Sequence, residues 1–176
     1  METMSIIAEF LALSTFIISY QMKKRKHIIL VNGCASVLYV LCYLLKGSLD
    51  GAVIDMISTG SAIAAGKKNK KFIAKHITFF LVIINLLLFL TGIVAYKNIF
   101  TFCAVFGAML QTSALWITDE KKIRIMSMIG SLFWIVFNIT VAAYGLAFGT
   151  FLSIVSIGTA IVRYDILPKR NKNWFI

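Results

Sequence analysis

Residues 46–63 read KGSLDGAVIDMISTGSAI, and residues 144–161 read YGLAFGTFLSIVSIGTAI. The two segments align without a gap at an offset of 98 positions, and six of their eighteen positions are identical. The identical pairs are Gly47/Gly145, Gly51/Gly149, Ser58/Ser156, Gly60/Gly158, Ala62/Ala160 and Ile63/Ile161. The similarity indicates an internal repeat, and the extent of that repeat decides how the chain is expected to fold.

The composition is that of an integral membrane protein. Hydrophobic residues make up 60% of the 176-residue chain and charged residues 14%, which is too little polar surface for a water-soluble domain of this size. Residues 77–96 and 98–118 carry no charge, and the uncharged run 125–162 is 38 residues long. A membrane-spanning helix needs about 20 apolar residues. The long run therefore predicts two spans, folded back at Ala143-Tyr144-Gly145.

Seven transmembrane helices are predicted, at residues 4–21, 27–45, 48–66, 77–96, 99–117, 125–143 and 146–164. The first is expected to be a retained span, because Glu2 and Glu9 stand where a signal peptide carries basic residues. The apolar segments show no sustained two-residue alternation, so strands are not expected. Sixteen of the 18 lysines and arginines fall in the connections on one side, and Lys46 and Lys97 fall on the other. The N-terminus is accordingly predicted outside and the C-terminus in the cytoplasm.

The net charge of +11 follows from the same asymmetry. Basic loops also meet anionic headgroups, so membrane lipid is an expected partner. Nucleic-acid binding is not expected, because the chain has no soluble module and no basic face interleaved with aromatic residues. The cysteines and histidines lack metal-ligand spacing, and the chain contains no catalytic constellation and no phosphate loop next to a strand. We therefore expect no enzyme activity, no metal and no cofactor.

The repeat extends well beyond the two opening segments. Further pairs at the same offset are Lys23-Lys24 with Lys121-Lys122, Lys26 with Arg124, Ser14-Thr15 with Thr112-Ser113, and Tyr39 with Phe137. Spans one to three thus match spans five to seven, which predicts a 3+1+3 parallel repeat of triple-helix bundles. The predicted divisions are 1–66 (first repeat), 67–98 (basic loop and linker helix), 99–164 (second repeat) and 165–176 (cytoplasmic tail). Shared apolar composition is the alternative source of such matches.

The glycines of the repeat fit close helix packing, because small residues let backbones approach each other in lipid. Gly47 and Gly145 begin the third helix of each unit. The pairs Gly51/Gly149 and Gly60/Gly158 are interpreted as packing positions, with a hinge role as the alternative.

Polar side chains within the spans are candidates for a binding site. Lipid tails offer them no hydrogen-bond partner, so they are expected to face protein or a wet cavity. Ser14, Ser36 and Thr112 fall near mid-depth. Serine and threonine hydroxyls can instead bond to carbonyls of their own helix, which is the alternative for each of them.

Spans three, five, six and seven carry most of the candidates. Helical spacing gives Asp55, Ser58 and Ala62 a common face in span three, and gives Ser153, Ser156 and Ala160 the corresponding face in span seven. Ser131, Trp134 and Asn138 lie one turn apart in span six, and Gln111 lies near mid-depth in span five. An indole beside a carboxamide suits a small polar solute. The alternative is that Trp134 fills space.

Glu9 and Asp55 lie in the outer halves of spans one and three, where the second repeat has Gly107 and Ser153. A carboxylate inside a span is costly and is a functional hypothesis by default. It could couple transport to a proton or cation, or capture a cationic group of a substrate. The alternative is that both lie in water near the outer interface, which suits Glu9 better than Asp55.

Residues 114–165, ALWITDEKKIRIMSMIGSLFWIVFNITVAAYGLAFGTFLSIVSIGTAIVRYD, resemble the C-terminal half of the YgjV-type bacterial inner-membrane proteins. The shared traits are a basic loop, a helix with a tryptophan and a later asparagine, a glycine-containing hairpin and an IxRYxx ending. Residues 20–60 agree with the same pattern. The family is similar to the wider SWEET, PQ-loop and PnuC-like transporter group. The resemblance implies an all-α, SWEET-like fold in the bacterial inner membrane and does not imply a particular substrate.

Two departures from that wider group weaken a sugar-facilitator reading. Tyr20-Gln21 stands where PQ-loop proteins carry Pro-Gln. The single proline, Pro168, lies in the predicted tail, whereas SWEET-type proteins use prolines as hinges in the first unit. Any bending would have to come from glycine-rich packing or rigid-body motion.

The sequence therefore favours a SWEET-like, alternating-access carrier of a small polar or cationic metabolite, with a site at the midplane between the two repeats. A sugar-like solute is included, and a proton would be co-transported if Asp55 titrates. The first alternative is a non-transporting membrane receptor or assembly protein of the same fold, and the second is a membrane enzyme. Trp134 is the one aromatic residue expected deep enough to line an aromatic slot of the PnuC type. The oligomeric state, a homo-oligomer included, is left open.

Overall fold

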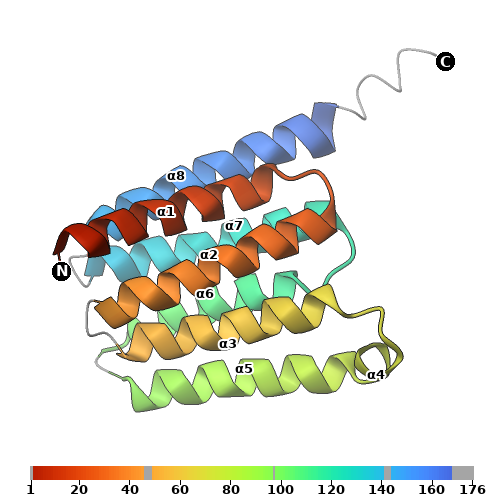
Figure 1. Cartoon of the computed structure of the whole chain (residues 1–176), viewed down its shortest axis with the longest axis horizontal. Helices are drawn as coiled ribbons and strands as arrows, with labels where there is room; N and C mark the ends of the chain where they lie inside the picture. Colours follow the sequence, from red (N-terminus) through yellow and green to blue (C-terminus); the bar gives the residue numbers. More distant parts are fainter. Residues whose placement is uncertain (1, 46–48, 97, 141–143, 168–176) are drawn as a thin grey trace.

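The computed structural model describes residues 2–45, 49–96, 98–140 and 144–167, and over these residues the chain is helical with no strand (Figure 1). The long helices are α1 (Glu2–Gln21), α2 (Arg25–Leu45), α3 (Leu49–Gly66), α5 (Ile77–Val94), α6 (Thr101–Ala114), α7 (Glu120–Thr140) and α8 (Tyr144–Ile161). A short helix α4 (Lys71–Lys75) precedes α5, and a π-helical turn η1 (Val162–Ile166) continues α8. The predicted all-α class is confirmed for this part of the chain.

A long helix lies at each of the seven predicted span positions. By length and composition, four stretches of the described residues suffice to cross a membrane: Arg25–Leu45, Ile77–Val94, Glu120–Thr140 and Leu146–Ile166. The apolar stretches Ile7–Gln21, Ala52–Gly66 and Thr101–Ala114 are shorter. Several predicted features lie outside the described residues, namely Lys46, Gly47, Lys97, Ala143 and the tail from Pro168 onward.

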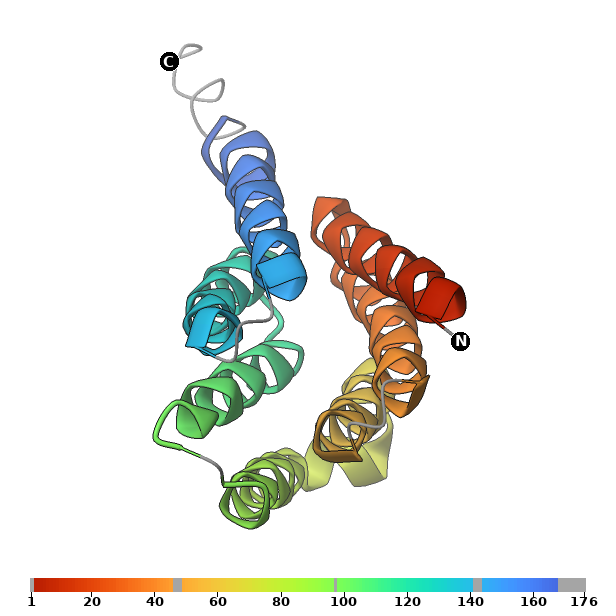
Figure 2. The same ribbon diagram turned by 90° about the vertical axis from the view of Figure 1, so that its left-hand side faces the viewer.

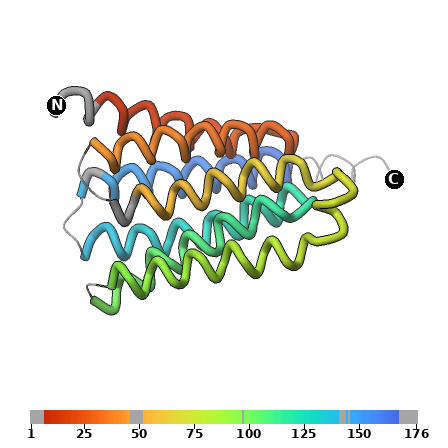
Figure 3. The backbone as a smooth tube through the Cα atoms, turned by 60° about the horizontal axis from the view of Figure 1, so that its bottom comes forward, coloured from red at the N-terminus to blue at the C-terminus, as the bar shows by residue number. Residues whose placement is uncertain are grey.

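The long helices run side by side and alternate in direction (Figures 1 and 3). Helices α1, α3, α6 and α8 run one way, whereas α2, α5 and α7 run the other way. Helix α2 packs on both α1 and α3, and α7 packs on both α6 and α8. We call α1–α3 the first group and α6–α8 the second group. Seen end-on, the two groups face each other, with α5 joining them at one edge and α1 meeting α8 at the other (Figure 2).

Large apolar side chains cover the outside of this assembly. Among the most exposed are Val94 (89%), Phe72 (69%) and Phe79 (61%). A water-soluble surface rarely shows so much contiguous apolar area, whereas lipid tails would cover it without penalty. The fully buried positions are instead mostly small or polar, which is typical of helices that pack in a membrane.

The glycine prediction is confirmed at one position and wrong at two. A Cβ on Gly149 would lie 3.0 Å from the Leu13 side chain, so α8 approaches α1 closely there. Gly60 and Gly158 have nothing within 4 Å of such a Cβ, and they are therefore not close packing positions. Their matched spacing did not reveal that both point away from neighbouring helices. The surroundings of Gly51 and Gly145 lie outside what the structure describes.

Candidate functional site

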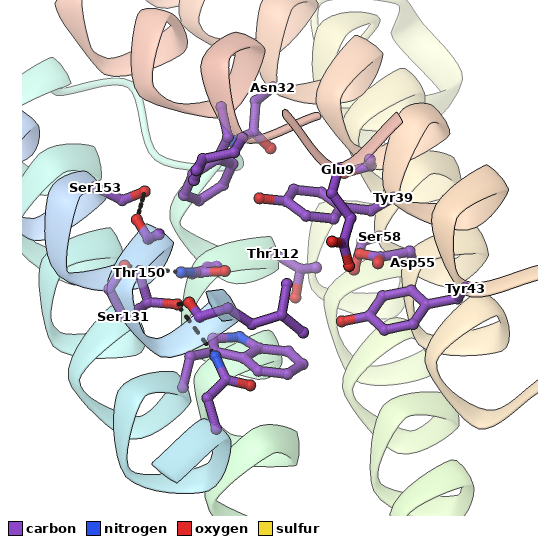
Figure 4. Close-up of a pocket in the computed structure, with 18 of the residues that line it drawn as sticks. Glu9, Asn32, Tyr39, Tyr43, Asp55, Ser58, Thr112, Ser131, Thr150 and Ser153 are labelled. Atoms are coloured by element: carbon purple, nitrogen blue, oxygen red, sulfur yellow. Dashed lines mark hydrogen bonds between the residues drawn. The ribbon is translucent and has the colours of Figure 1, made fainter. Parts of the chain in front are cut away.

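A cavity of about 300 Å³ lies between the two helix groups (Figure 4). Each group contributes half of the residues that line it. We call the lining residues of the first group the first wall; they are Glu9, Phe10, Leu13, Phe16, Asn32, Ser36, Tyr39, Tyr43, Asp55 and Ser58. The second wall, from the second group and the residue after α6, consists of Gln111, Thr112, Leu115, Ser131, Trp134, Asn138, Leu146, Gly149, Thr150 and Ser153.

The first wall is acidic. The side chains of Glu9 and Asp55 point into the cavity beside Tyr39 and Tyr43 (Figure 4). Among the described residues that line the cavity, none is a lysine, arginine or histidine. The lining therefore carries two acidic groups and no basic one.

Helix α2 presents a polar stripe to the cavity. Asn32, Ser36, Tyr39 and Tyr43 follow one another at spacings of three and four residues, which places them on one face of the helix. Ser36 is 8% exposed. Within the described part of the chain, the hydroxyls of Ser36, Tyr39 and Tyr43 have no hydrogen-bond partner. These groups are therefore available to a bound molecule.

The second wall presents amides and an indole. Gln111 Nε2 donates to Ser131 Oγ at 3.1 Å, and Asn138 Nδ2 donates to Thr150 Oγ1 at 3.2 Å. Each bond joins a side-chain amide to the neighbouring helix and holds the amide at the cavity surface. The amide carbonyl oxygens make no hydrogen bond to any described residue, so they can accept one from a ligand.

The indole of Trp134 is held in place by a close crossing of α6 and α7. A Cβ on Gly107 would lie 2.8 Å from Trp134 Cδ1 and 2.9 Å from the Gly130 carbonyl oxygen. The Phe137 ring packs edge-on against the indole, with 6.0 Å between the ring centroids. Only glycine fits at positions 107 and 130 without a shift of a helix or of a neighbouring side chain. The position of the indole is therefore fixed by the packing of the two backbones.

Seven of the eight predicted site residues line this one cavity: Glu9, Asp55, Ser58, Gln111, Trp134, Asn138 and Ser153. The predicted common face of Ser131, Trp134 and Asn138 is confirmed, since all three are lining residues. Ser58 and Ser153 also donate to their own helices, at the carbonyls of Ile54 and Gly149, as the alternative reading anticipated.

Ser156, the eighth predicted site residue, does not line the cavity. Its Oγ donates to the Ile17 carbonyl at 3.2 Å and accepts from Gln21 Nε2 at 2.8 Å. Ser156 thus joins α8 to α1. Ser156 lies about one turn further along α8 than Ser153, at a level where the side chain meets α1 instead of the cavity.

The aromatic lining is wider than predicted. Trp134 is accompanied by Tyr39 and Tyr43, and by Phe10 and Phe16 from α1. Tyr39 and Tyr43 are not among the predicted site residues, because depth within a span does not distinguish a lining tyrosine from one at the lipid interface. Their spacing from Asn32 and Ser36 was the signal that could have identified them.

At the end of the assembly that carries the basic loops, Arg25 connects the two groups. Its Nε donates to the Ile117 carbonyl at 2.6 Å, and its Nη2 donates to the carbonyls of Leu115 at 2.6 Å and Ala65 at 3.1 Å. The last carbonyls of a helix have no partner within the helix. Arg25, at the start of α2 in the first group, therefore caps the end of α6 in the second group.

Arg124 makes the reciprocal connection from α7 to the end of α1. Its Nη2 donates to the Met22 carbonyl at 3.0 Å and its Nε to the Tyr20 carbonyl at 3.5 Å. Its Nη1 donates to both carboxylate oxygens of Asp165 at 3.0 Å. The side chain is 1% exposed. These arginines were predicted only as a topology signal, and their role in joining the groups was not foreseen.

Both connections reach the cavity. Leu115 lines the cavity, and its carbonyl accepts from Arg25. Asn32 also lines it and donates to the Tyr20 hydroxyl at 3.4 Å. Nearby, Lys68 Nζ donates to the Trp116 carbonyl at 2.9 Å, and burial, reinforced by the charge of Arg25, lowers the pKa of Lys68. The cavity is thus closed toward the basic end by bonds between the groups.

A model of the Imp-YgjV family, described as a bacterial inner membrane protein, matches residues 3–166. The chain belongs to this family. The family resemblance predicted from the sequence is thereby confirmed, and so is the predicted class of bacterial inner-membrane protein. The four apolar stretches that are long enough to cross a membrane agree with this class. No curated protein and no solved structure matches the chain. The wider likeness to SWEET and PQ-loop proteins stays a prediction.

Proposed function

We propose that the chain is a membrane carrier that moves a small polar or cationic metabolite by alternating access. The observation that carries this proposal is the cavity between two groups of three helices in an inner-membrane protein, lined by both polar and apolar side chains. Polar side chains facing an internal cavity at membrane depth are typical of solute pathways. The lining combines hydrogen-bonding groups with aromatic surface, as binding sites for small molecules do.

In this proposal all seven long helices span the membrane as a 3+1+3 parallel repeat, with the N-terminus outside. The alternating helix directions support it, as do the equivalent packing of α2 and α7 and the gathering of basic loops at one end. By the positive-inside rule that end faces the cytoplasm. Helix α5 is then the linker that lets the second repeat keep the direction of the first.

The bonds of Arg25 and Arg124 close the cytoplasmic end in the proposed cycle. Opening toward the cytoplasm would require the two groups to separate there, and these bonds would break. Since each arginine caps the helix end of the opposite group, separation would expose carbonyls that water could then satisfy. The conformation described would be the one open away from the cytoplasm.

Counterflow in proteoliposomes tests the carrier proposal. Vesicles containing the purified chain would be loaded with a mixture of unlabelled amines, polyols and amino acids, and uptake of each labelled compound would be measured. A carrier should accumulate at least one compound transiently above its equilibrium level. Binding without any counterflow would instead support the receptor or assembly alternative.

Arg25→Ala and Lys26→Ala form a matched pair for the closed end. Both remove one positive charge from the same connection, but Lys26 is exposed and Arg25 bonds to three carbonyls of other segments. Arg25→Ala should slow counterflow several-fold, whereas Lys26→Ala should not. Equal rates in both variants would contradict a role for these bonds in the cycle.

A further inference from the structure

We propose that the carried solute is a small organic cation whose positive group binds between Glu9 and Asp55, with its apolar part against Trp134. This inference rests on the proposed function and narrows it to one class of substrate. The acidic groups belong to the first wall and the indole belongs to the second, so the solute would bridge the two helix groups.

The charge balance of the cavity is the first argument. Glu9 and Asp55 reach the same space from α1 and α3, and the lining residues that the structure describes include no basic side chain. A carboxylate at membrane depth is costly unless a positive charge lies nearby. For Asp55, a cationic solute would supply that charge, whereas an anionic solute would be placed beside acidic side chains.

Hydrogen-bonding capacity is the second argument. Ser36, which is 8% exposed, lines the cavity, and its hydroxyl has no partner among the described residues. The same holds for the hydroxyls of Tyr39 and Tyr43. The amide nitrogens of Gln111 and Asn138 are engaged with Ser131 and Thr150, which leaves their carbonyl oxygens as acceptors. Ammonium and guanidinium groups are donors only, so this surplus of acceptor atoms matches them.

Aromatic surface is the third argument. Trp134 lines the cavity from the second wall. Tyr39 and Tyr43 lie beside the carboxylates of Glu9 and Asp55 (Figure 4). Alkylated ammonium groups are attracted to the faces of tryptophan and tyrosine rings. A cavity of about 300 Å³ accommodates an organic molecule and is larger than an inorganic ion requires.

Matched pairs of charged and neutral probes test the proposal. Choline and its neutral isostere 3,3-dimethyl-1-butanol have the same shape, and benzylamine and benzyl alcohol form a second pair. Binding to the full chain in lipid nanodiscs would be measured by calorimetry. At least one cation should bind, and its neutral partner should bind at least tenfold more weakly. Equal binding within both pairs, or binding by neither pair, would overturn the proposal.

Variants locate the charge. Asp55→Asn and Glu9→Gln should each weaken binding of the cationic probe, by at least tenfold for Asp55→Asn. Asp119→Asn is the matched control because it removes a carboxylate from the exposed loop before α7, and asparagine preserves the cap that Asp119 gives to the Lys121 amide. Cation binding that is unchanged in Asp55→Asn and Glu9→Gln would also overturn the proposal.

Uptake of the probe that binds separates this inference from the carrier proposal. In proteoliposomes, a negative internal potential set with potassium and valinomycin should accelerate entry of the cation. Cation-selective binding without uptake would support the cation-binding site between Glu9 and Asp55 and contradict the carrier. Uptake of a neutral solute with no cation selectivity would support the carrier and contradict the inference.

Discussion

The two walls of the cavity occupy corresponding places in the two helix groups but differ in chemistry. At the 98-residue offset, Glu9 of the first wall corresponds to Gly107, and Asp55 corresponds to Ser153. Conversely, Trp134 of the second wall corresponds to Ser36. The first wall therefore carries the acidic groups, and the second carries a flat aromatic surface and amides. Two helix groups of similar backbone arrangement can thus differ in role, one supplying acidic groups that neutralise a positive charge and the other supplying an aromatic surface.

Packing explains why one group cannot carry both features at this level. The indole of Trp134 lies where a side chain at position 107 would project, since even a Cβ there would be 2.8 Å from Trp134 Cδ1. In the first group, Ser36 is small and leaves room near Glu9. An acid at position 107 and an indole at 134 exclude each other sterically, so the acid belongs to one wall and the indole to the other.

The largest effect is expected from moving the charge between walls. Asp55→Asn should weaken binding of an organic cation by about 100-fold, because removing one partner of a desolvated charge pair costs about 3 kcal/mol. Adding Ser153→Asp should recover part of that loss, since Ser153 is the corresponding residue and lines the same cavity. Calorimetry with choline in nanodiscs would measure both. If Ser153→Asp did not recover any binding in the Asp55→Asn variant, positions 55 and 153 would not be equivalent, and the proposed correspondence of the two walls would be contradicted.

A smaller effect is expected from the helix crossing that holds the indole. Gly107→Ala should lower the free energy of unfolding by about 2 kcal/mol, because overpacking a close contact forces helices or side chains to shift. Gly158→Ala, with nothing within 4 Å of the added Cβ, is the control and should be tolerated. Unfolding in mixed micelles would compare them. Equal stabilities would mean that the crossing does not fix the second wall.

Trp134→Ala should weaken cation binding by about tenfold, which corresponds to about 1.4 kcal/mol and lies in the range of a desolvated cation–π contact. Phe133→Ala is the control because Phe133, the preceding residue of α7, is 37% exposed and does not line the cavity. Intrinsic binding constants from calorimetry would decide. A loss of the same size in both variants would attribute the effect to helix packing and not to the ring face.

The sequence predicted the helices better than it predicted their rotation about their own axes. Uncharged runs and basic clusters marked seven helical segments, because burial in lipid and loop charge are local properties. Spacing within one helix also placed Ser131, Trp134 and Asn138 on one face correctly. Ser156 was misplaced because the direction in which a face points depends on contacts with other helices, here with Gln21 and Ile17 of α1.

The arginines show the same limit from the other direction. Lys26 and Arg124 were paired by the repeat, yet Arg25 is the residue that reciprocates Arg124 in the fold. Aligning apolar helices does not distinguish position 25 from position 26, but the position decides which side chain reaches the opposite group. Tyr39 and Tyr43 were missed for a related reason, since tyrosine occurs both at lipid interfaces and in binding sites.

The smallest expected effect concerns two serines, one on each wall. The hydroxyl of Ser36 has no partner within the described residues, whereas that of Ser153 donates to the Gly149 carbonyl at 3.0 Å. Ser36→Ala should therefore weaken binding of a cationic probe by about threefold, within the modest net worth of one hydrogen bond. Ser153→Ala should change binding by less than that, because its hydroxyl is already engaged. If Ser153→Ala instead produced the larger loss, hydrogen bonding to the solute would come from the second wall, and the division of tasks between the walls would have to be reversed.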